Sequence, residues 1–178
     1  MFEVYKYSVR LFIASLVSIF ALSSFGFANS APPQASIDAV RKEIEGVYAK
    51  RDKAFKTKDF EFLKSQETSD YTEKSKDGTV RGKEESDAMA DQMAPMVKEV
   101  TEQVTKVENV TAGDADGELV VESSDHGRLT LAGPDGQAHE AVGSSHQRDT
   151  WVKTKDGWKI KYHEELDSHV EIDGKPVN

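Results

Sequence analysis

The chain has 178 residues, of which 31% are charged, with a formal net charge of −9 and no cysteine. An acidic surface repels nucleic acid and anionic lipid, so neither is expected as a partner. The absence of cysteine excludes a disulfide framework and a thiol nucleophile, so the fold must depend on hydrophobic burial. The length suits one ordinary domain.

Residues 1–28 have the pattern of an export signal. Lys6 and Arg10 give a positive start, residues 11–27 are apolar or small, and small residues precede a cleavage site after Ala28. An uncleaved membrane anchor is the alternative, because this stretch approaches the ~18 residues that span a bilayer. Four serines interrupt the stretch and favour cleavage. We therefore expect a periplasmic or secreted protein that has no membrane contact after cleavage.

Residues 29–35 contain two prolines and no periodic pattern, which predicts a disordered leader. A single domain of residues 36–178 follows. Ser36 has the chemistry of an N-cap, and apolar residues recur behind it at three- and four-residue spacing as far as Lys56. This pattern predicts an amphipathic first helix. Its apolar residues are Ile37, Val40, Ile44, Val47 and Ala54.

The rest of the chain predicts two more helices and then strands. Asp59 is placed to cap a short second helix, residues 71–79 suggest a strand and a turn, and a third helix begins near Lys83. From Val97 onward β-branched residues dominate, although the valine spacing also fits a helix; we predict strand. Glycine-rich turns divide this region into four long strands. These turns cover residues 113–117, 133–136 and 154–157.

The last hairpin carries the most specific motif, which runs from Asp149 through Trp151 and the turn to Trp158 and Ile160. With a weaker match between residues 59 and 78, it resembles the nuclear transport factor two-like superfamily, which includes ketosteroid isomerase and the SnoaL-like cyclases. The likeness covers residues 36–172. It implies an α+β fold, a cone-shaped curved antiparallel sheet wrapped around about three N-terminal helices, with a pocket at one end and often a homodimer. It implies no particular reaction.

Strand parity predicts which side chains of the last hairpin face the pocket. If Trp158, Ile160 and Tyr162 point inward, then Glu164 does so too. An even-length turn puts Trp151 on the same face, whereas a three-residue turn with a bulge would swap the faces. We prefer the even-length turn because it buries both tryptophans together.

In this register three carboxylates face inward: Asp149 and Glu164 across the hairpin, and Asp125 on the preceding strand. A carboxylate in an apolar cavity, or beside another, has a raised pKa and can act as a base or a proton donor. Asp149 and Glu164 are therefore the candidate catalytic residues. In the alternative, these acids lie solvated or paired at the open rim. The candidate ligand-binding residues are Tyr48, Tyr71, Asp125, Gln147, Trp151 and Tyr162.

The other face of the last strand alternates His163, Glu165, Asp167 and His169, all of which are metal-ligand types. Ligands ~6.6 Å apart on a flat strand rarely close on one ion. A solvated outer face with cross-strand charge pairs is the better interpretation. No metal and no cofactor is expected.

These patterns favour an exported domain that binds a small apolar ligand in the cone without catalysis. One alternative is an isomerase- or cyclase-like enzyme that transfers a proton on a small apolar carbonyl compound, with Asp149 or Glu164 as the base. The other is a dimerising structural module whose own side chains fill the cavity. The sequence does not match the catalytic residues of ketosteroid isomerase, which favours the non-catalytic hypothesis.

Overall fold

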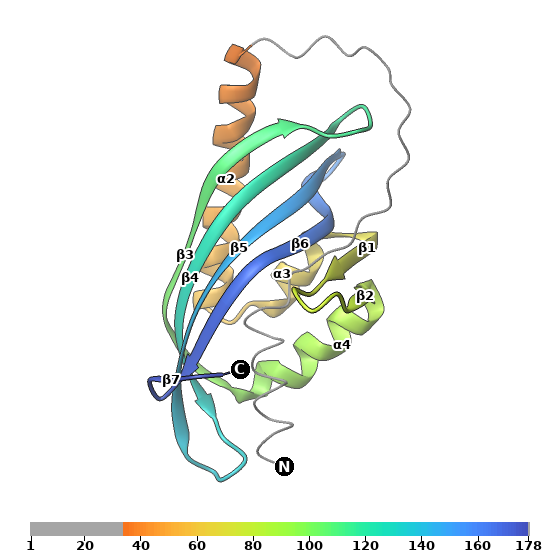
Figure 1. The fold of residues 1–178 in the computed structure, drawn as a ribbon. Helices are drawn as coiled ribbons and strands as arrows, with labels where there is room; N and C mark the ends of the chain where they lie inside the picture. Colours follow the sequence, from red (N-terminus) through yellow and green to blue (C-terminus); the bar gives the residue numbers. More distant parts are fainter. Residues whose placement is uncertain (1–33, 178) are drawn as a thin grey trace.

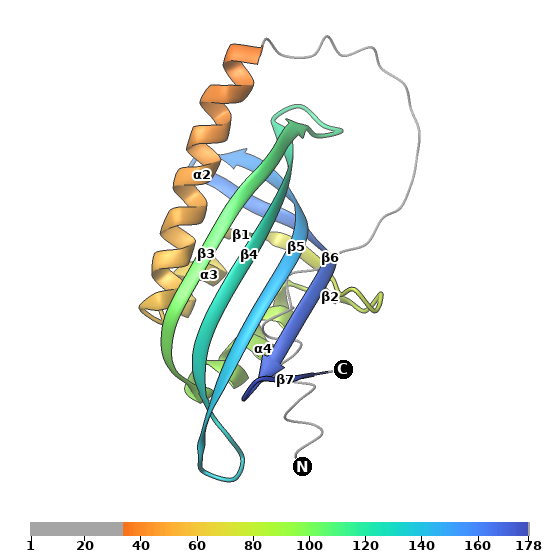
Figure 2. The ribbon, with the colours of Figure 1, turned by 60° about the vertical axis from the view of Figure 1, so that its left-hand side comes forward.

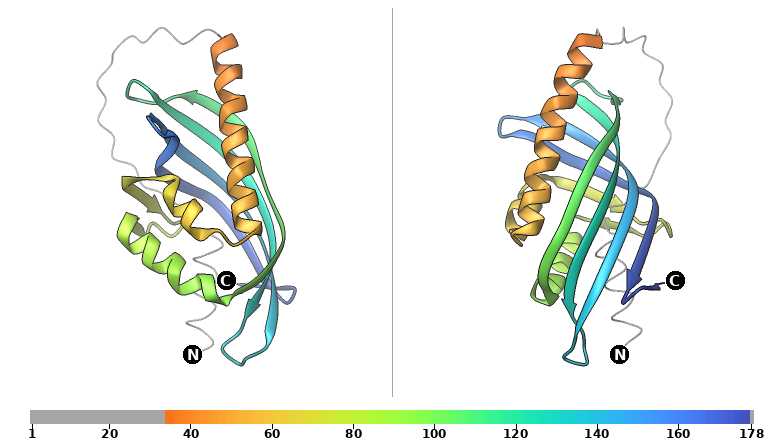
Figure 3. Two further views of the ribbon diagram at one scale, coloured as in Figure 1. Left: turned by 180° about the vertical axis from the view of Figure 1, so that it is seen from behind. Right: turned by 90° about the vertical axis from the view of Figure 1, so that its left-hand side faces the viewer.

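The computed structural model describes residues 34–177, so the expected export signal, residues 1–28, and the leader up to residue 33 lie outside the described residues. The domain has two layers, with helices packed in the hollow of a strongly curved sheet (Figure 1). The longest helix runs beside one edge of the sheet (Figure 2), and the shorter helices lie across the lower part of the hollow (Figure 3). No helix within the described range is long and apolar enough to cross a membrane.

The predicted helices form close to the expected positions. Helix α2 (Gln34–Lys56) begins two residues before Ser36. Helix α3 (Phe60–Ser65) is capped by Asp59, whose carboxylate accepts a hydrogen bond from the Phe62 amide at 3.0 Å. Helix α4 (Lys83–Met93) continues into the 3-10 turn η1 (Ala94–Met96), where a proline ends the α-helical bonding.

The strands form one curved sheet, and the four-strand antiparallel meander is confirmed. The sheet order is β2-β1-β6-β5-β4-β3, and β1 adds to β6 in the parallel direction. A two-residue strand, β7, pairs with the end of β6. The bounds are β1 (Glu67–Lys74), β2 (Val80–Gly82), β3 (Val97–Ala112), β4 (Glu118–Ala132), β5 (Ala138–Thr154), β6 (Gly157–Ile172) and β7 (Lys175–Pro176).

The core has two clusters, one at each end of the hollow. Met93, Leu129 and Leu131 belong to the cluster beneath α4, and Tyr48 and Trp151 belong to the cluster beneath α2. Trp151 is fully buried. Trp158, which we expected to be an equal core anchor, is half-buried and packs against the margin of the second cluster.

Strand β6 departs from regular pairing, and this overturns part of the predicted register. The turn is even-length as expected, with Thr154 opposite Gly157, but one extra residue, Lys161, bulges between Ile160 and Tyr162. A bulge shifts every following side chain to the other face. The prediction that Tyr162 and Glu164 share the inward face with Trp151 is therefore wrong.

The same bulge corrects the prediction for the other face of β6. His163 and Glu165 were expected on the solvated outer face, yet they are only 0% and 5% exposed. Asp149 therefore lies opposite His163, and Glu164 lies opposite Arg148. A second irregularity at Leu166 restores the original parity, so Val170 is buried as predicted.

Candidate functional site

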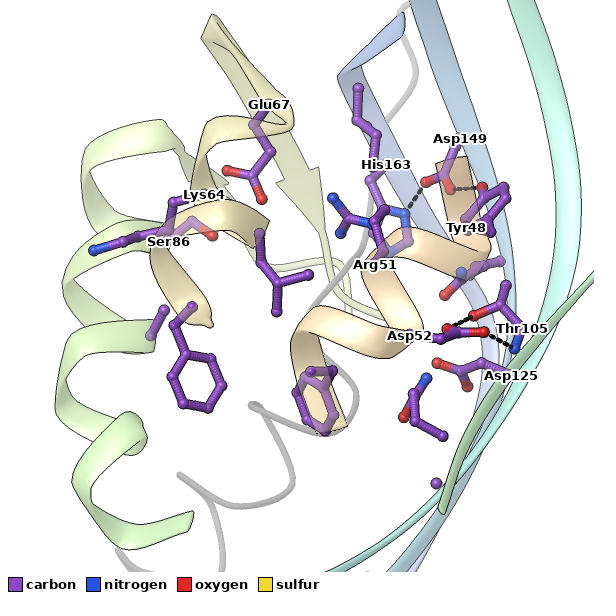
Figure 4. Close-up of a pocket in the computed structure, with 18 of the residues that line it drawn as sticks. Tyr48, Arg51, Asp52, Lys64, Glu67, Ser86, Thr105, Asp125, Asp149 and His163 are labelled. Carbon is purple, nitrogen blue, oxygen red and sulfur yellow. Dashed lines mark hydrogen bonds and ion pairs between the residues drawn. The ribbon is translucent and has the colours of Figure 1, made fainter. Parts of the chain in front are cut away.

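A cavity of about 150 Å³ lies between the concave face of the sheet and helices α2, α3 and α4. A volume of this order holds one benzene-sized ring. Part of the lining is apolar, from Phe55, Phe60, Leu63 and Leu129, and the sheet also contributes polar side chains to the cavity wall. Figure 4 shows side chains from α2, β6 and the neighbouring strands meeting in this space.

One face of α2 lines the cavity with four side chains: Tyr48, Arg51, Asp52 and Phe55. They follow the spacing of three and four residues that aligns side chains along one side of a helix. The Asp52 carboxylate accepts two hydrogen bonds from Thr105 on β3, at 2.9 Å from its amide and 2.7 Å from its hydroxyl. These contacts hold that face of α2 against the sheet.

Two strand glycines leave room for the cavity. Gly127 of β4 is the cross-strand partner of Gly143 of β5, and both line the cavity. A β-carbon at Gly127 would lie 2.7 Å from the side-chain oxygen of Gln103, which also lines the cavity. Glycine inside a strand often marks a place where a ligand approaches the backbone.

A buried hydrogen-bond chain connects α2 to β5 and β6. The indole N–H of Trp151 donates to the Tyr48 hydroxyl at 3.2 Å, the Tyr48 hydroxyl donates to one oxygen of Asp149, and the other oxygen of Asp149 contacts Nδ1 of His163. Asp149 and His163 are both 0% exposed. Burial, followed by the charge of Asp149, raises the pKa of Tyr48 well above its usual value, so this phenol keeps its proton.

The direction of these hydrogen bonds determines where the protons lie. An indole N–H can only donate, so the Tyr48 oxygen accepts from Trp151 and gives its own proton to Asp149. An ionised Asp149 accepts from both sides, and Nδ1 of His163 therefore carries a hydrogen. In the neutral form of this ring the lone pair is on Nε2, which is buried and has no hydrogen-bond partner among the described residues.

Asp125 adds a second proton-binding group to the sheet wall. One of its oxygens accepts hydrogen bonds from the Ser145 amide at 2.9 Å and the Ser145 hydroxyl at 2.7 Å. Burial raises the pKa of Asp125, and the negative charge of Asp52 raises it further. The cavity therefore contains a histidine whose Nε2 bonds to no described residue and a carboxyl group whose pKa is raised by burial.

The structure places the predicted site residues in three different environments. Tyr48, Asp125, Gln147 and Asp149 line the cavity. Tyr71 and Trp151 are buried in the core cluster next to it. Tyr162 and Glu164 face away from the cavity, where Arg148 and Lys74 each form an ion pair with Glu164 at 3.2 Å. The roles assigned to these residues stay predictions, and the expected Asp149–Glu164 pair does not form.

Sequence reasoning missed His163, Arg51 and Asp52. Projecting the helix from Tyr48 would have found Arg51 and Asp52, because they follow it by three and four residues. The glycines within predicted strands were a second available signal for the cavity. His163 had no such signal, because its face depends on the bulge. Among residues 34–177, no three His, Asp or Glu side chains are placed to share a metal ion.

No protein-family model and no curated protein matches the chain. Solved structures do resemble it. A conserved protein from Planctomyces limnophilus has a TM-score of 0.58 at 20% identity, over 76% of this chain and 98% of that one. A candidate scytalone dehydratase from Novosphingobium aromaticivorans has a TM-score of 0.57 at 14% identity, over 76% and 90%. A candidate dehydratase of the NTF2-like family from Streptomyces avermitilis has a TM-score of 0.51 at 15% identity, over 72% and 96%.

Proposed function

We propose that this chain, which has the nuclear transport factor two-like fold, is an acid–base enzyme that moves a proton on a small, ring-sized carbonyl compound. The observation that carries the proposal is the buried chain from Tyr48 through Asp149 to His163, which ends in a free Nε2. A buried imidazole oriented by a carboxylate is a common general base. This replaces Asp149 or Glu164 as the base, and Asp149 becomes the positioning residue for His163.

The proposed reaction begins with transfer of a proton from the carbon beside the carbonyl group to Nε2 of His163. The electron pair of the broken C–H bond forms an enolate, and the imidazole becomes imidazolium, which the Asp149 carboxylate stabilises. Return of the proton completes an isomerisation or an exchange. Asp125, whose pKa is raised by burial, is the candidate proton donor to a leaving hydroxyl group. Dehydration of a hydroxy carbonyl compound would use both steps, which fits the two candidate dehydratases among the similar structures.

The test is exchange of the α-hydrogens of cyclohexanone in deuterated buffer, followed by proton NMR. The wild-type protein should accelerate exchange above the buffer rate. His163→Gln should lower the protein-dependent rate by about 10²–10⁴-fold, which is the usual contribution of a general base. His146→Gln is the matched control, because His146 is another β5–β6 sheet histidine whose side chain is 42% exposed outside the cavity.

Unchanged exchange in His163→Gln would refute His163 as the base. If the wild-type protein binds cyclohexanone without accelerating its exchange, the domain is a binding module, as the sequence first suggested. Asp149→Asn provides an independent check. It should lower the exchange rate without preventing binding, because it changes the tautomer of His163 while leaving the cavity lining in place.

We also propose that the protein acts in the periplasm or outside the cell. The support comes from the positive start, the apolar segment and the small residues before residue 28, together with the absence of cysteine. The homodimer implied by the resemblance stays a prediction.

A further inference from the structure

Arg51 is the cavity residue whose charge the proposed reaction does not use. It projects from the same face of α2 as Tyr48 and Asp52, whose polar atoms are bonded to Asp149 and Thr105. Nη1 of Arg51 is buried, and it makes no hydrogen bond to any described residue. Figure 4 shows this guanidinium in the same cavity as the His163 imidazole. A buried guanidinium nitrogen without a partner is costly, which points to a ligand group that pairs with it.

Glu67, an acid near Arg51, is shared with another cation. The charge of Arg51 lowers the pKa of Glu67, and so does Lys83, which lies 3.2 Å from Glu67 and also pairs with Asp87. Burial outweighs both cations and raises the pKa of Glu67. The other basic residue of the lining, Lys64, is paired with Glu61 at 2.6 Å and Asp91 at 2.7 Å. Of these two basic residues of the lining, Arg51 is the one with a buried N–H group that bonds to no described residue.

We propose that Arg51 binds a carboxylate on the ligand, so that the cavity takes a small cyclic carboxylic acid. The planar guanidinium matches a carboxylate with two parallel hydrogen bonds, and such charge-assisted pairs are stronger in an enclosed site. The apolar part of the lining, from Phe55, Phe60 and Leu63, packs against the ring. The inference rests on the proposed function, because the cyclic carboxylic acid is the substrate on which His163 acts. Binding of the acid does not itself require His163.

The probes are benzoate and benzamide, which have the same ring and nearly the same shape but differ in charge. Binding is followed by NMR through the two indole N–H signals of the chain. Trp151 donates to Tyr48 beside the cavity, so its signal should shift on binding. The indole N–H of Trp158 donates instead to Glu43 of α2, at 2.8 Å, and its signal serves as an internal reference. Benzoate should bind at least about tenfold more tightly than benzamide.

Three substitutions separate the charge of Arg51 from other effects. Arg51→Gln should weaken benzoate binding by about tenfold or more and leave benzamide unchanged, and Arg51→Lys should recover part of the loss. Lys50→Gln is the matched control, because it removes one positive charge from the neighbouring, exposed position of α2. It should bind benzoate like the wild type.

Three results would each refute the proposal: no binding of benzoate, equal affinity for benzoate and benzamide, or unchanged benzoate affinity in Arg51→Gln. The wild-type comparison of the two probes remains decisive if Arg51→Gln fails to fold. His163→Gln distinguishes this proposal from the proposed function. If Arg51 is the anchor, the His163→Gln variant should still bind benzoate. This holds even if the proposed function fails, that is, if this variant and the wild type exchange the cyclohexanone hydrogens at the same slow rate.

Discussion

At the scale of single residues, the two tryptophans of the last hairpin have different surroundings. Trp151 is 0% exposed, contacts the Tyr48 ring edge-on with centroids 5.3 Å apart, and donates its indole hydrogen to the Tyr48 hydroxyl. Trp158 is half-buried, its indole hydrogen bonds to Glu43, and the Lys153 ammonium lies 4.7 Å from the centre of its ring. Trp151 therefore connects the core to the site, and Trp158 covers the margin.

Trp151→Ala should lower the free energy of unfolding by about 3–5 kcal/mol, because it leaves a cavity in the core and removes the donor to Tyr48. Trp158→Ala is the matched control and should cost about 1–2 kcal/mol, since its ring is already partly in water. Urea unfolding monitored by circular dichroism measures both values. Equal losses would contradict the assignment of Trp151 as the main anchor.

At the scale of elements, a buried ion pair fastens β1, β2 and α4 together. Nε of Arg81 on β2 donates to Glu73 on β1 at 2.7 Å, and these residues are 5% and 1% exposed. Arg81 also donates to Ser75 at 2.9 Å, and Glu73 accepts from the Ser86 hydroxyl of α4 at 3.2 Å. Glu67 on β1 and Ser86 on α4 both line the cavity. The ion pair between Arg81 and Glu73 therefore also supports this side of the cavity wall.

Arg81→Met should destabilise the fold by about 3–5 kcal/mol, because Glu73 then stays buried without its cation. The double substitution Glu73→Leu with Arg81→Met should recover most of this loss, since no unpaired charge remains. Arg128→Met breaks an exposed pair with Glu140 at 2.8 Å and is the control, with an expected cost below about 1 kcal/mol. Thermal melts of the four proteins give these values. A double variant as unstable as Arg81→Met would contradict the explanation.

At the scale of the whole molecule, several carboxyl groups are buried in or near the hollow of the sheet. Burial raises the pKa values of Glu67, Asp125 and Glu165. An acid whose pKa is higher in the folded state binds more protons there, so its contribution to stability decreases as pH rises from its unfolded value near ~4 through its folded value. Ionisation of these three groups therefore lowers the stability of the fold as the pH rises from ~4 towards neutrality.

Asp125→Asn should stabilise the protein at pH 7 relative to the wild type, and the gain should shrink as the pH falls towards ~4. The amide oxygen of asparagine can still accept both hydrogen bonds from Ser145, so the packing of β4 against β5 should persist. Asp156→Asn, at an exposed turn position, is the control and should leave the pH profile unchanged. Parallel stability curves for Asp125→Asn and the wild type between pH 4 and pH 7 would contradict the prediction.

The sequence by itself determined the three helices, the strand before the third helix and the four long strands, in their order. The Asp59 cap, the helical spacing after Ser36 and the three glycine-rich turns each appear in the structure close to where they were predicted. These signals are local, because capping, helical periodicity and turn chemistry depend on residues within a few positions of one another. The local pattern of the last hairpin, with the weaker match between residues 59 and 78, was enough to predict the fold. Strand parity placed Asp125, Gln147 and Asp149 on the inward side.

Only the tertiary structure decided what the site contains. The extra residue Lys161 is defined by the pairing of β6 with β5, and it moves His163 inward and Glu164 outward. Period-two alternation carries no trace of such a bulge, because the bulge exists between strands and not within one. Tyr48 reaches Asp149 across 101 positions of the chain through the packing of α2 on the sheet. The buried Nε2 of His163 and the buried Nη1 of Arg51, which bond to no residue in the described range, are consequences of that packing, and no local pattern predicts them.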